Sequence, residues 1–146
     1  MDTQKILPRS EVPEELTWDL RDIFPSDEAW RAEYDALAAV RDEYKRRRDT
    51  VVRKLKEIPG VVCECPKGAF YLMAALPVDD ADKFQQWLLE EFEDNGDTVM
   101  FAPGEPFYAT PGKGKNEVRI AYVLKQADLE RAMDLLALGI KAYNAR

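Results

Sequence analysis

One arginine inside an apolar stretch is the clearest candidate for chemistry in this sequence. Residues 116–123 read Asn-Glu-Val-Arg-Ile-Ala-Tyr-Val, and the alternation of a strand places Val118, Ile120 and Tyr122 on one face. Arg119 lies on the other face, and both faces are mostly apolar, which predicts a central strand covered on both sides. A guanidinium is costly to bury unless an anion meets it, and its planar fork of donors suits a carboxylate. We therefore predict that Arg119 either binds an anionic ligand or has a structural role, paired with an acid of this chain or turned out at a sheet edge.

Other groups that could do chemistry have a simpler structural interpretation. The loop 101–115 is rich in glycine and lysine, but it lacks the spacing of known phosphate-binding loops, which favours a solvated connector over a phosphate cradle. The basic run 41–48 is interleaved with acids and predicts a solvated helix face. Cys63 has no histidine base and is expected to pack in the core. The carboxylates at 79–82 and 90–93 suit a helix start and an exposed helix face rather than a metal or acid–base site.

Composition narrows the class of protein. The chain has 146 residues, 46% of them hydrophobic and 34% charged, which is typical of one folded domain with a core. Its net charge of -7 argues against nucleic acid or an anionic membrane as a partner. The absence of histidine excludes histidine-based catalysis and imidazole zinc sites. With no apolar run long enough to span a bilayer, no signal segment, and Cys63 and Cys65 interpreted as reduced core thiols, we expect a cytoplasmic protein.

The first third of the chain predicts an arm followed by one long helix. Prolines at 8, 13 and 25 favour an extended arm over residues 1–26. Ser26 and the acids after it are a helix start, and Pro59-Gly60 is the next stop, so we predict a helix over 27–58 within a single unit of residues 27–146. A helix of that length reaches well over about 40 Å, so part of it must project or be covered by another chain. We expect a homo-oligomer formed through its apolar stripe at Trp30, Tyr34 and Leu37.

The remainder predicts a small layered α+β unit, a two-layer α/β arrangement. Two strands, 61–64 and 69–75, flank a proline–glycine turn and form a hairpin. A helix from Asp79–Asp80 to Phe92, a short strand at 98–101, the Arg119 strand and a helix over 126–143 follow. Helices packed on a small, mainly antiparallel sheet account for this order.

Several motifs from residue 41 onward occur together in one known family. They are Tyr44-Lys-Arg-Arg-Arg-Asp, Ile58-Pro-Gly-Val, Pro66-Lys-Gly-Ala-Phe-Tyr, Phe101-Ala-Pro-Gly, Phe107-Tyr-Ala-Thr-Pro-Gly and Glu117-Val-Arg-Ile-Ala-Tyr-Val-Leu. Residues 41–146 resemble the C-terminal small domain of the class I pyridoxal-phosphate aminotransferases, the aspartate aminotransferase group. The resemblance implies that Arg119 binds the α-carboxylate of the substrate. Pro106 departs from the pattern, because the family more often has a small residue there.

Residues 7–37 resemble a different family. The segments Leu7-Pro-Arg-Ser-Glu-Val-Pro-Glu-Glu-Leu and Thr17-Trp-Asp-Leu-Arg-Asp-Ile-Phe-Pro-Ser are similar to the N-terminus of oligoendopeptidase F, a zinc peptidase. The zinc motif His-Glu-x-x-His of that family is absent, so no peptidase chemistry follows. We interpret the chain as a chimera whose two parts join within one helix near Leu37–Arg41.

The departures from the aminotransferase pattern determine the expected function. The family presents its Schiff-base lysine in a Ser-x-x-Lys setting in the large domain, whereas Ser10 and Ser26 are followed three residues later by Pro13 and Ala29. We therefore expect no catalytic residue, no metal site and no bound cofactor in this chain alone, although the family uses pyridoxal phosphate. The expected function is a non-catalytic domain with Arg119 open to an amino-acid or dicarboxylate anion. The alternative is a fragment that takes part in amino-group transfer together with a separate large domain.

Overall fold

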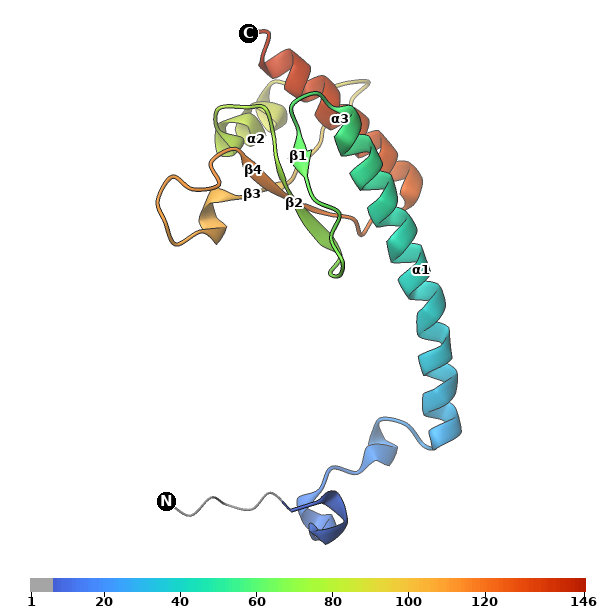
Figure 1. Cartoon of the computed structure of the whole chain (residues 1–146). Helices are drawn as coiled ribbons and strands as arrows, with labels where there is room; N and C mark the ends of the chain where they lie inside the picture. Colours follow the sequence, from blue (N-terminus) through green and yellow to red (C-terminus); the bar gives the residue numbers. More distant parts are fainter. Residues whose placement is uncertain (1–6) are drawn as a thin grey trace. The chain divides into compact units, whose positions relative to one another are not determined.

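The computed structural model describes residues 7–146, which divide into two compact units between Val40 and Arg41 (Figure 1). The division falls inside helix α1 (Asp27–Glu57), which belongs to both units. The predicted separation of an arm at 1–26 from a unit at 27–146 stays a prediction, and its first six residues lie outside the described part.

In the first unit, the described residues before α1 form three single 3-10 turns. These are η1 (Arg9–Glu11), η2 (Glu14–Leu16) and η3 (Leu20–Asp22). Helix α1 then begins as expected, because the Ser26 hydroxyl accepts a hydrogen bond from the amide of Ala29 at 3.2 Å. Acids at 27 and 28 occupy the first turn, where they stabilise the positive end of the helix dipole.

The end of α1 belongs to the second unit and is buried there. The helix spans 31 residues, one fewer than the predicted 27–58, and stops before Pro59-Gly60. Gly60 has a φ of 83°, a left-handed conformation that glycine adopts without strain. Only residues near the C-terminal end of α1 are buried, namely Thr50, Val51, Val52 and Leu55.

A four-stranded antiparallel sheet forms the centre of the second unit. Its strands are β1 (Val62–Cys63), β2 (Tyr71–Ala75), β3 (Ala102–Pro103) and β4 (Glu117–Ala121), in the order β1-β2-β4-β3. The predicted hairpin is present as β1 and β2, whose register pairs Cys63 with Ala74. β2 and β4 are the two central strands, and Met73 faces Arg119 across them.

The third strand lies later than the sequence predicted, at 102–103 instead of 98–101. Two hydrogen bonds explain the shift. The Thr98 hydroxyl donates to the carbonyl of Leu88 at 2.8 Å, and the amide of Phe101 donates to the Gln85 side chain at 2.9 Å. Both partners lie on α2 (Ala81–Glu90), so the segment 98–101 is tied to a helix and pairing with β4 begins only after it.

Helices α1, α2 and α3 (Gln126–Tyr143) contribute to one core on one side of the sheet. Lys54 on α1 contacts Asp134 on α3 at 2.6 Å, which ties these two helices together. The rings of Phe84 on α2 and Tyr143 on α3 lie 5.0 Å apart. Gly139 on α3 allows α2 to approach closely, because a Cβ there would lie 2.7 Å from Leu88. The fold is therefore α+β with two layers, as predicted.

Within the second unit, no α-helix covers the opposite face of the sheet, which corrects the prediction of a strand covered on both sides. Val118, Ile120 and Tyr122 are buried against the helices. Arg119 is only half-buried, and Ala121 is exposed. The reason is that all three α-helices of the described residues pack on the same side, so alternate residues of the central strands remain open.

Asp80 caps α2 and provides a direct test of this local structure. Its Oδ1 accepts hydrogen bonds from the amides of Asp82 at 3.0 Å and Lys83 at 3.2 Å. The bond from the Lys83 amide, with Lys115 as a further partner, holds the pKa of the Asp80 carboxyl below its usual range. We expect Asp80→Ala to lower the free energy of unfolding by about 1 kcal/mol at neutral pH, measured by urea denaturation.

Asp80→Asn is the matched control, because asparagine caps a helix but does not titrate. Since the carboxyl pKa is lower in the folded state, its stabilising effect is present above the unfolded pKa of about 3.9 and is lost as pH falls through the folded pKa. Any advantage of the wild type over Asp80→Asn at neutral pH should therefore shrink in acid. A wild-type advantage that persists at a pH of about 2 would contradict this assignment.

Candidate functional site

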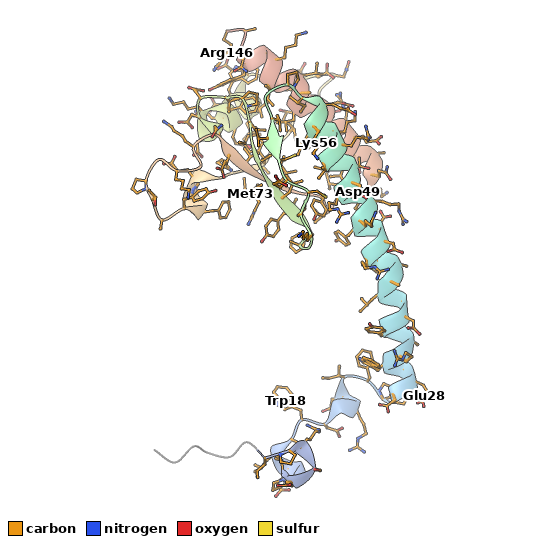
Figure 2. The ribbon with its side chains drawn as sticks, in the orientation of Figure 1. Trp18, Glu28, Asp49, Lys56, Met73 and Arg146 are labelled. Carbon is orange, nitrogen blue, oxygen red and sulfur yellow. The ribbon has the colours of Figure 1, made fainter. Side chains whose placement is uncertain are left out.

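Arg119 lies at the centre of β4, on the open face of the sheet. Its neighbours across the strands are Met73 on β2 and Ala102 on β3. Met73 is labelled in Figure 2, where the sheet is seen with its side chains. Because β4 is hydrogen-bonded on both edges, the backbone that carries Arg119 is held firmly.

Two aromatic rings hold the guanidinium group. Its central carbon lies 5.4 Å from the centroid of the Tyr71 ring and 4.7 Å from that of Phe107. The negative face of an aromatic ring attracts a cation, and the rings also limit the directions in which the side chain can point. Neither ring accepts the in-plane hydrogen bonds that a guanidinium can donate.

No described residue forms an ion pair or a hydrogen bond with the Arg119 side chain. Of the alternatives stated for Arg119, pairing with an acid of this chain is therefore not found among the described residues. What the structure offers is a half-buried cation with aromatic neighbours and unused donors. Such an arrangement can receive a planar anion such as a carboxylate.

The loop after β3 brings Phe107 to the arginine. Its 3-10 turn η4 (Glu105–Phe107) starts at Gly104, whose amide donates to the carbonyl of Glu117 at 2.7 Å. A Cβ at Gly104 would lie 2.7 Å from that same oxygen, so only glycine allows this approach. Two residues of β4 thus contact this loop. Glu117 binds its backbone at Gly104, and the Arg119 guanidinium lies against its Phe107 ring.

A second contact fixes the loop from its other end. The hydroxyl of Tyr108 donates to Glu117 Oε2 at 2.5 Å, and this bond raises the pKa of the Tyr108 phenol. The amide of Gly112 donates to Glu105 Oε1 at 3.1 Å. Because a carboxylate of the chain already takes this amide, the loop does not present it to a phosphate. The solvated-connector interpretation fits this geometry better than a phosphate cradle does.

Sequence reasoning identified Arg119 but missed the residues around it. Tyr71 reaches the arginine through the register of β2 against β4, and Phe107 through the fold of a loop. The aromatic pair Phe70-Tyr71 beside a predicted turn was the available signal for Tyr71. No periodicity could have signalled Phe107, since it lies in a single 3-10 turn of a loop, outside any α-helix or strand.

The other candidate residues do not gather into a site. Both cysteines are free, and Cys63 packs against the core, where burial raises the pKa of its thiol. Cys65 is exposed, which corrects its predicted core position, because β1 ends at Cys63 and the chain turns away. No group of potential metal ligands occurs among residues 7–146, and no helix there is long and apolar enough to cross a membrane.

The donors around Arg119 do not by themselves fit pyridoxal phosphate. That cofactor needs a lysine amine for its Schiff base and donors for its phosphate. The groups that contact or flank the guanidinium are two rings, a thioether and a methyl group, from Tyr71, Phe107, Met73 and Ala102. None of these can supply either function, so no step of amino-group transfer is derived for this chain alone.

The chain matches known aminotransferases in sequence. It is 34% identical to the aspartate aminotransferase of Pyrococcus horikoshii over 118 residues, which cover 80% of this chain and 27% of that protein. It is 33% identical to the aspartate aminotransferase of Bacillus subtilis over 123 residues, covering 80% and 29% respectively. The chain thus spans less than a third of the length of these relatives.

Solved structures show the same similarity. An aromatic aminotransferase from Pyrococcus horikoshii matches with a TM-score of 0.62 and 30% identity, over 82% of this chain and 29% of that one. An α-aminoadipate aminotransferase from Thermus thermophilus matches with a TM-score of 0.64 and 27% identity, over 77% and 28%. The model of the family "Aminotransferase class I and II" matches residues 26–136. Because this match includes most of the residues, the chain belongs to the class I and II aminotransferase family.

Proposed function

We propose that this chain is a non-catalytic aminotransferase-type domain in which Arg119 receives the carboxylate of an amino-acid or dicarboxylate anion. The observation that carries the proposal is the position of its guanidinium. The group lies between Tyr71 and Phe107, on the open face of a rigid sheet, with no acid of the described residues paired to it. A guanidinium arranged in this way lacks an anionic partner and has free N–H donors, and a carboxylate can accept hydrogen bonds from them.

Catalysis by the chain alone does not follow from this site. Transamination requires an electron sink, which pyridoxal phosphate supplies in this family. The neighbours of Arg119 offer no lysine, and the sequence contains no Ser-x-x-Lys motif. The chain would therefore bind and orient an anion through Arg119 without changing it.

The second candidate function is amino-group transfer in a complex with a separate large domain. That domain would carry the lysine and the cofactor contacts. The open face of the sheet favours this candidate, because Tyr71 and Phe107 are both exposed large rings beside Arg119. Exposed apolar groups next to an unpaired cation are typical of a surface that another domain covers. In that complex Arg119 would hold the substrate carboxylate while the partner carries out the chemistry.

We also propose that the chain is a chimera, with residues 7–37 taken from an oligoendopeptidase F-like protein. The division of the structure between Val40 and Arg41 supports a junction near Leu37–Arg41. The match to the aminotransferase family begins at residue 26, so the two resemblances overlap within the first half of α1. A helix can accept such a join when its apolar stripe stays in phase across it.

We propose that the chain binds a second copy of itself through the first half of α1. Trp30, Tyr34 and Leu37 are 43%, 54% and 59% exposed, and they lie on one stripe of the helix. The rings of Trp30 and Tyr34 stack 5.3 Å apart with the Arg31 guanidinium beside both. A stripe of this kind is suited to pairing with the same stripe of a second copy.

The Arg119 proposal is tested by titrating the full chain with aspartate and following backbone amide shifts. We expect saturable shifts centred on β4, Tyr71 and Phe107, and we expect Arg119→Ala to abolish them. Arg119→Lys should weaken binding, because an ammonium cannot form the bidentate contact. Lys83→Ala, which removes an exposed charge on α2, is the control and should bind like the wild type. Equal shifts in Arg119→Ala would refute the role.

The stability of Arg119→Ala distinguishes a binding role of the arginine from a structural one. Since Arg119 is half-buried and has no ion pair among the described residues, Arg119→Ala should change the unfolding free energy by less than about 1 kcal/mol. A much larger loss, measured by urea denaturation, would indicate that the arginine serves the fold.

The large-domain candidate is tested by spectroscopy. A mixture of the chain, an aminotransferase large domain, pyridoxal phosphate and aspartate should show an absorbance change in the cofactor band. The change should disappear with Arg119→Ala and persist with Lys83→Ala. An unchanged spectrum with every large domain tried would eliminate this candidate and leave the binding proposal intact.

The self-association proposal predicts a concentration-dependent mass in sedimentation equilibrium. Substitution of Trp30, Tyr34 and Leu37 by alanine together should shift the chain to a monomer, because the apolar stripe is removed. Leu89→Ala with Met100→Ala, which removes exposed apolar groups elsewhere, is the matched control and should not. A wild-type monomer at micromolar concentration would rule out the association.

A further inference from the structure

A cavity of about 520 Å³ opens at the edge of the sheet, where the pairing of β3 with β4 ends. The last pair of that ladder is Ala102 with Arg119, so β4 has no strand beside it on this edge at Ala121, among the described residues. The cause is the segment 98–101, which Thr98 and Phe101 tie to α2 instead of to β4. A space that strand pairing would otherwise fill is therefore left open.

This cavity is lined by residues of both faces of the sheet. Arg119 and Ala121 belong to the open face, and Ile120 belongs to the helix-covered face, yet all three line it. A space that contacts alternate residues of one strand on both faces passes around the edge of that strand. The cavity therefore leads from the surface that carries the Arg119 guanidinium to the layer formed by helix α3.

The inner wall of the cavity is apolar and buried. Helix α3 contributes Leu129, Met133 and Leu136 to it, and all three are almost completely inaccessible to solvent. At the rim lies the exposed side chain of Met100. Arg119 is the one charged residue among the described residues that line the cavity, and none of these is an acid. An apolar cavity with one cation at its opening suits an amphipathic anion.

Hydrogen bonds to two helices hold the walls of the cavity in place. On one side, the Thr98 hydroxyl donates to the carbonyl of Leu88 on α2 at 2.8 Å. On the other side, Nη1 of Arg47 on α1 donates to the carbonyl of Val123 at 2.7 Å, which fixes the chain just after β4. Because both walls are ordered before a ligand binds, the cavity loses less conformational entropy on binding than a flexible surface would.

The Arg119 guanidinium and the opening of the cavity share one part of the open face. The guanidinium lies against the ring of Tyr71, and Tyr71 is the register partner of Ala121, which lines the cavity. Neither Tyr71 nor Phe107 lines the cavity. A ligand inside it therefore leaves in place the two rings that hold the arginine.

We propose, on the basis of the carboxylate-binding role proposed for Arg119, that this cavity holds the alkyl chain of a fatty carboxylate while the guanidinium binds its head group. The guanidinium donates to the carboxylate oxygens, and each methylene of the chain that leaves water favours binding. The second carboxylate of a dicarboxylate would meet no cation in the cavity, so such an anion leaves the cavity empty. The ligand class is thus a straight-chain monocarboxylate.

The test is a titration of the full chain with octanoate, acetate and octanol, each below the concentration at which it self-associates, followed by backbone amide shifts. Octanoate should give saturable shifts at 98–102, 119–124 and 129–136. It should bind at least about tenfold more tightly than acetate, because its added methylenes leave water. Octanol, which lacks the charge, should bind several-fold more weakly than octanoate, and Arg119→Ala should remove that difference.

Ala132→Phe and Ala137→Phe form a matched pair of variants. Both replace a half-buried alanine of α3, and only Ala132 lines the cavity. Ala132→Phe should weaken octanoate binding to the level of acetate, because the new ring occupies the space of the alkyl chain. Ala137→Phe should bind octanoate like the wild type. An equal loss of affinity in both variants would overturn the proposal.

The comparison of octanoate with acetate in the wild type does not depend on the folding of either variant. If octanoate binds no more tightly than acetate while acetate still requires Arg119, the cavity is not its site, and the carboxylate role of the arginine stands. If both anions bind equally well to Arg119→Ala, the carboxylate role fails and the present proposal fails with it. Non-saturating shifts spread over many exposed apolar residues would also overturn it.

Discussion

Burial of one face of the sheet under three helices is the constraint on which the rest of the second unit depends. Phe84 and Leu88 from α2, with Leu55 from α1, are completely inaccessible to solvent within the described structure. Each large apolar side chain buried in this way contributes about 1.5–3 kcal/mol. Because the helices supply this core from one side only, β2 and β4 keep an open face. The placement of Arg119 follows from that asymmetry.

The open face explains how the charge of Arg119 is tolerated in an apolar strand. The guanidinium does not need a buried counter-ion, because it stays in contact with solvent and with two rings. Tyr71 and Phe107 restrict it, and Gly104 and Tyr108 anchor the loop that carries Phe107 onto Glu117. The arginine is therefore ordered by its surroundings without being neutralised by them.

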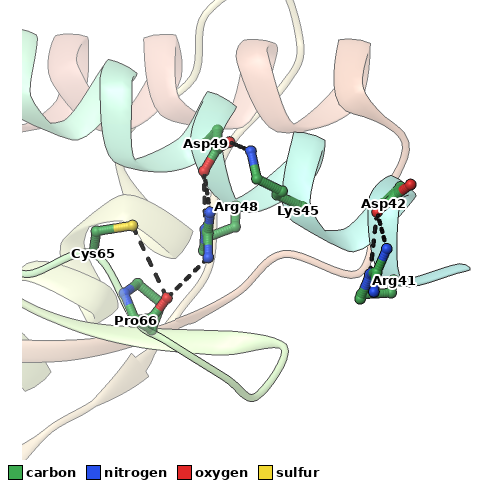
Figure 3. Close-up of polar contacts among 7 residues, drawn as sticks. All are labelled: Arg41, Asp42, Lys45, Arg48, Asp49, Cys65 and Pro66. Carbon is green, nitrogen blue, oxygen red and sulfur yellow. Dashed lines mark hydrogen bonds and ion pairs between the residues drawn. The ribbon is translucent and has the colours of Figure 1, made fainter. Parts of the chain in front are cut away.

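The cations in the second half of α1 are held in a different way, by carboxylates and a backbone carbonyl instead of aromatic rings (Figure 3). There the positive groups are long side chains from one helix, and carboxylates one or four residues away hold some of them. Arg48 is fixed across to the hairpin by the Pro66 carbonyl. Arg48 and Arg119 are thus both ordered by a contact from a segment other than the one that carries them.

Much of the fold was predictable from the sequence, because its signals are local. Helical spacing and caps located α1 and α3 within one residue, and the alternation around Arg119 located β4. The predicted position of the third strand was wrong, because Thr98 and Phe101 form hydrogen bonds with residues of α2. Periodicity along the sequence does not indicate such a contact. The sequence by itself determined most of the elements, the family and the strand that carries Arg119. Only the tertiary structure decided that one sheet face stays open, that Tyr71 and Phe107 hold the arginine, and that Arg48 bonds to the Pro66 carbonyl, since each depends on how distant segments pack.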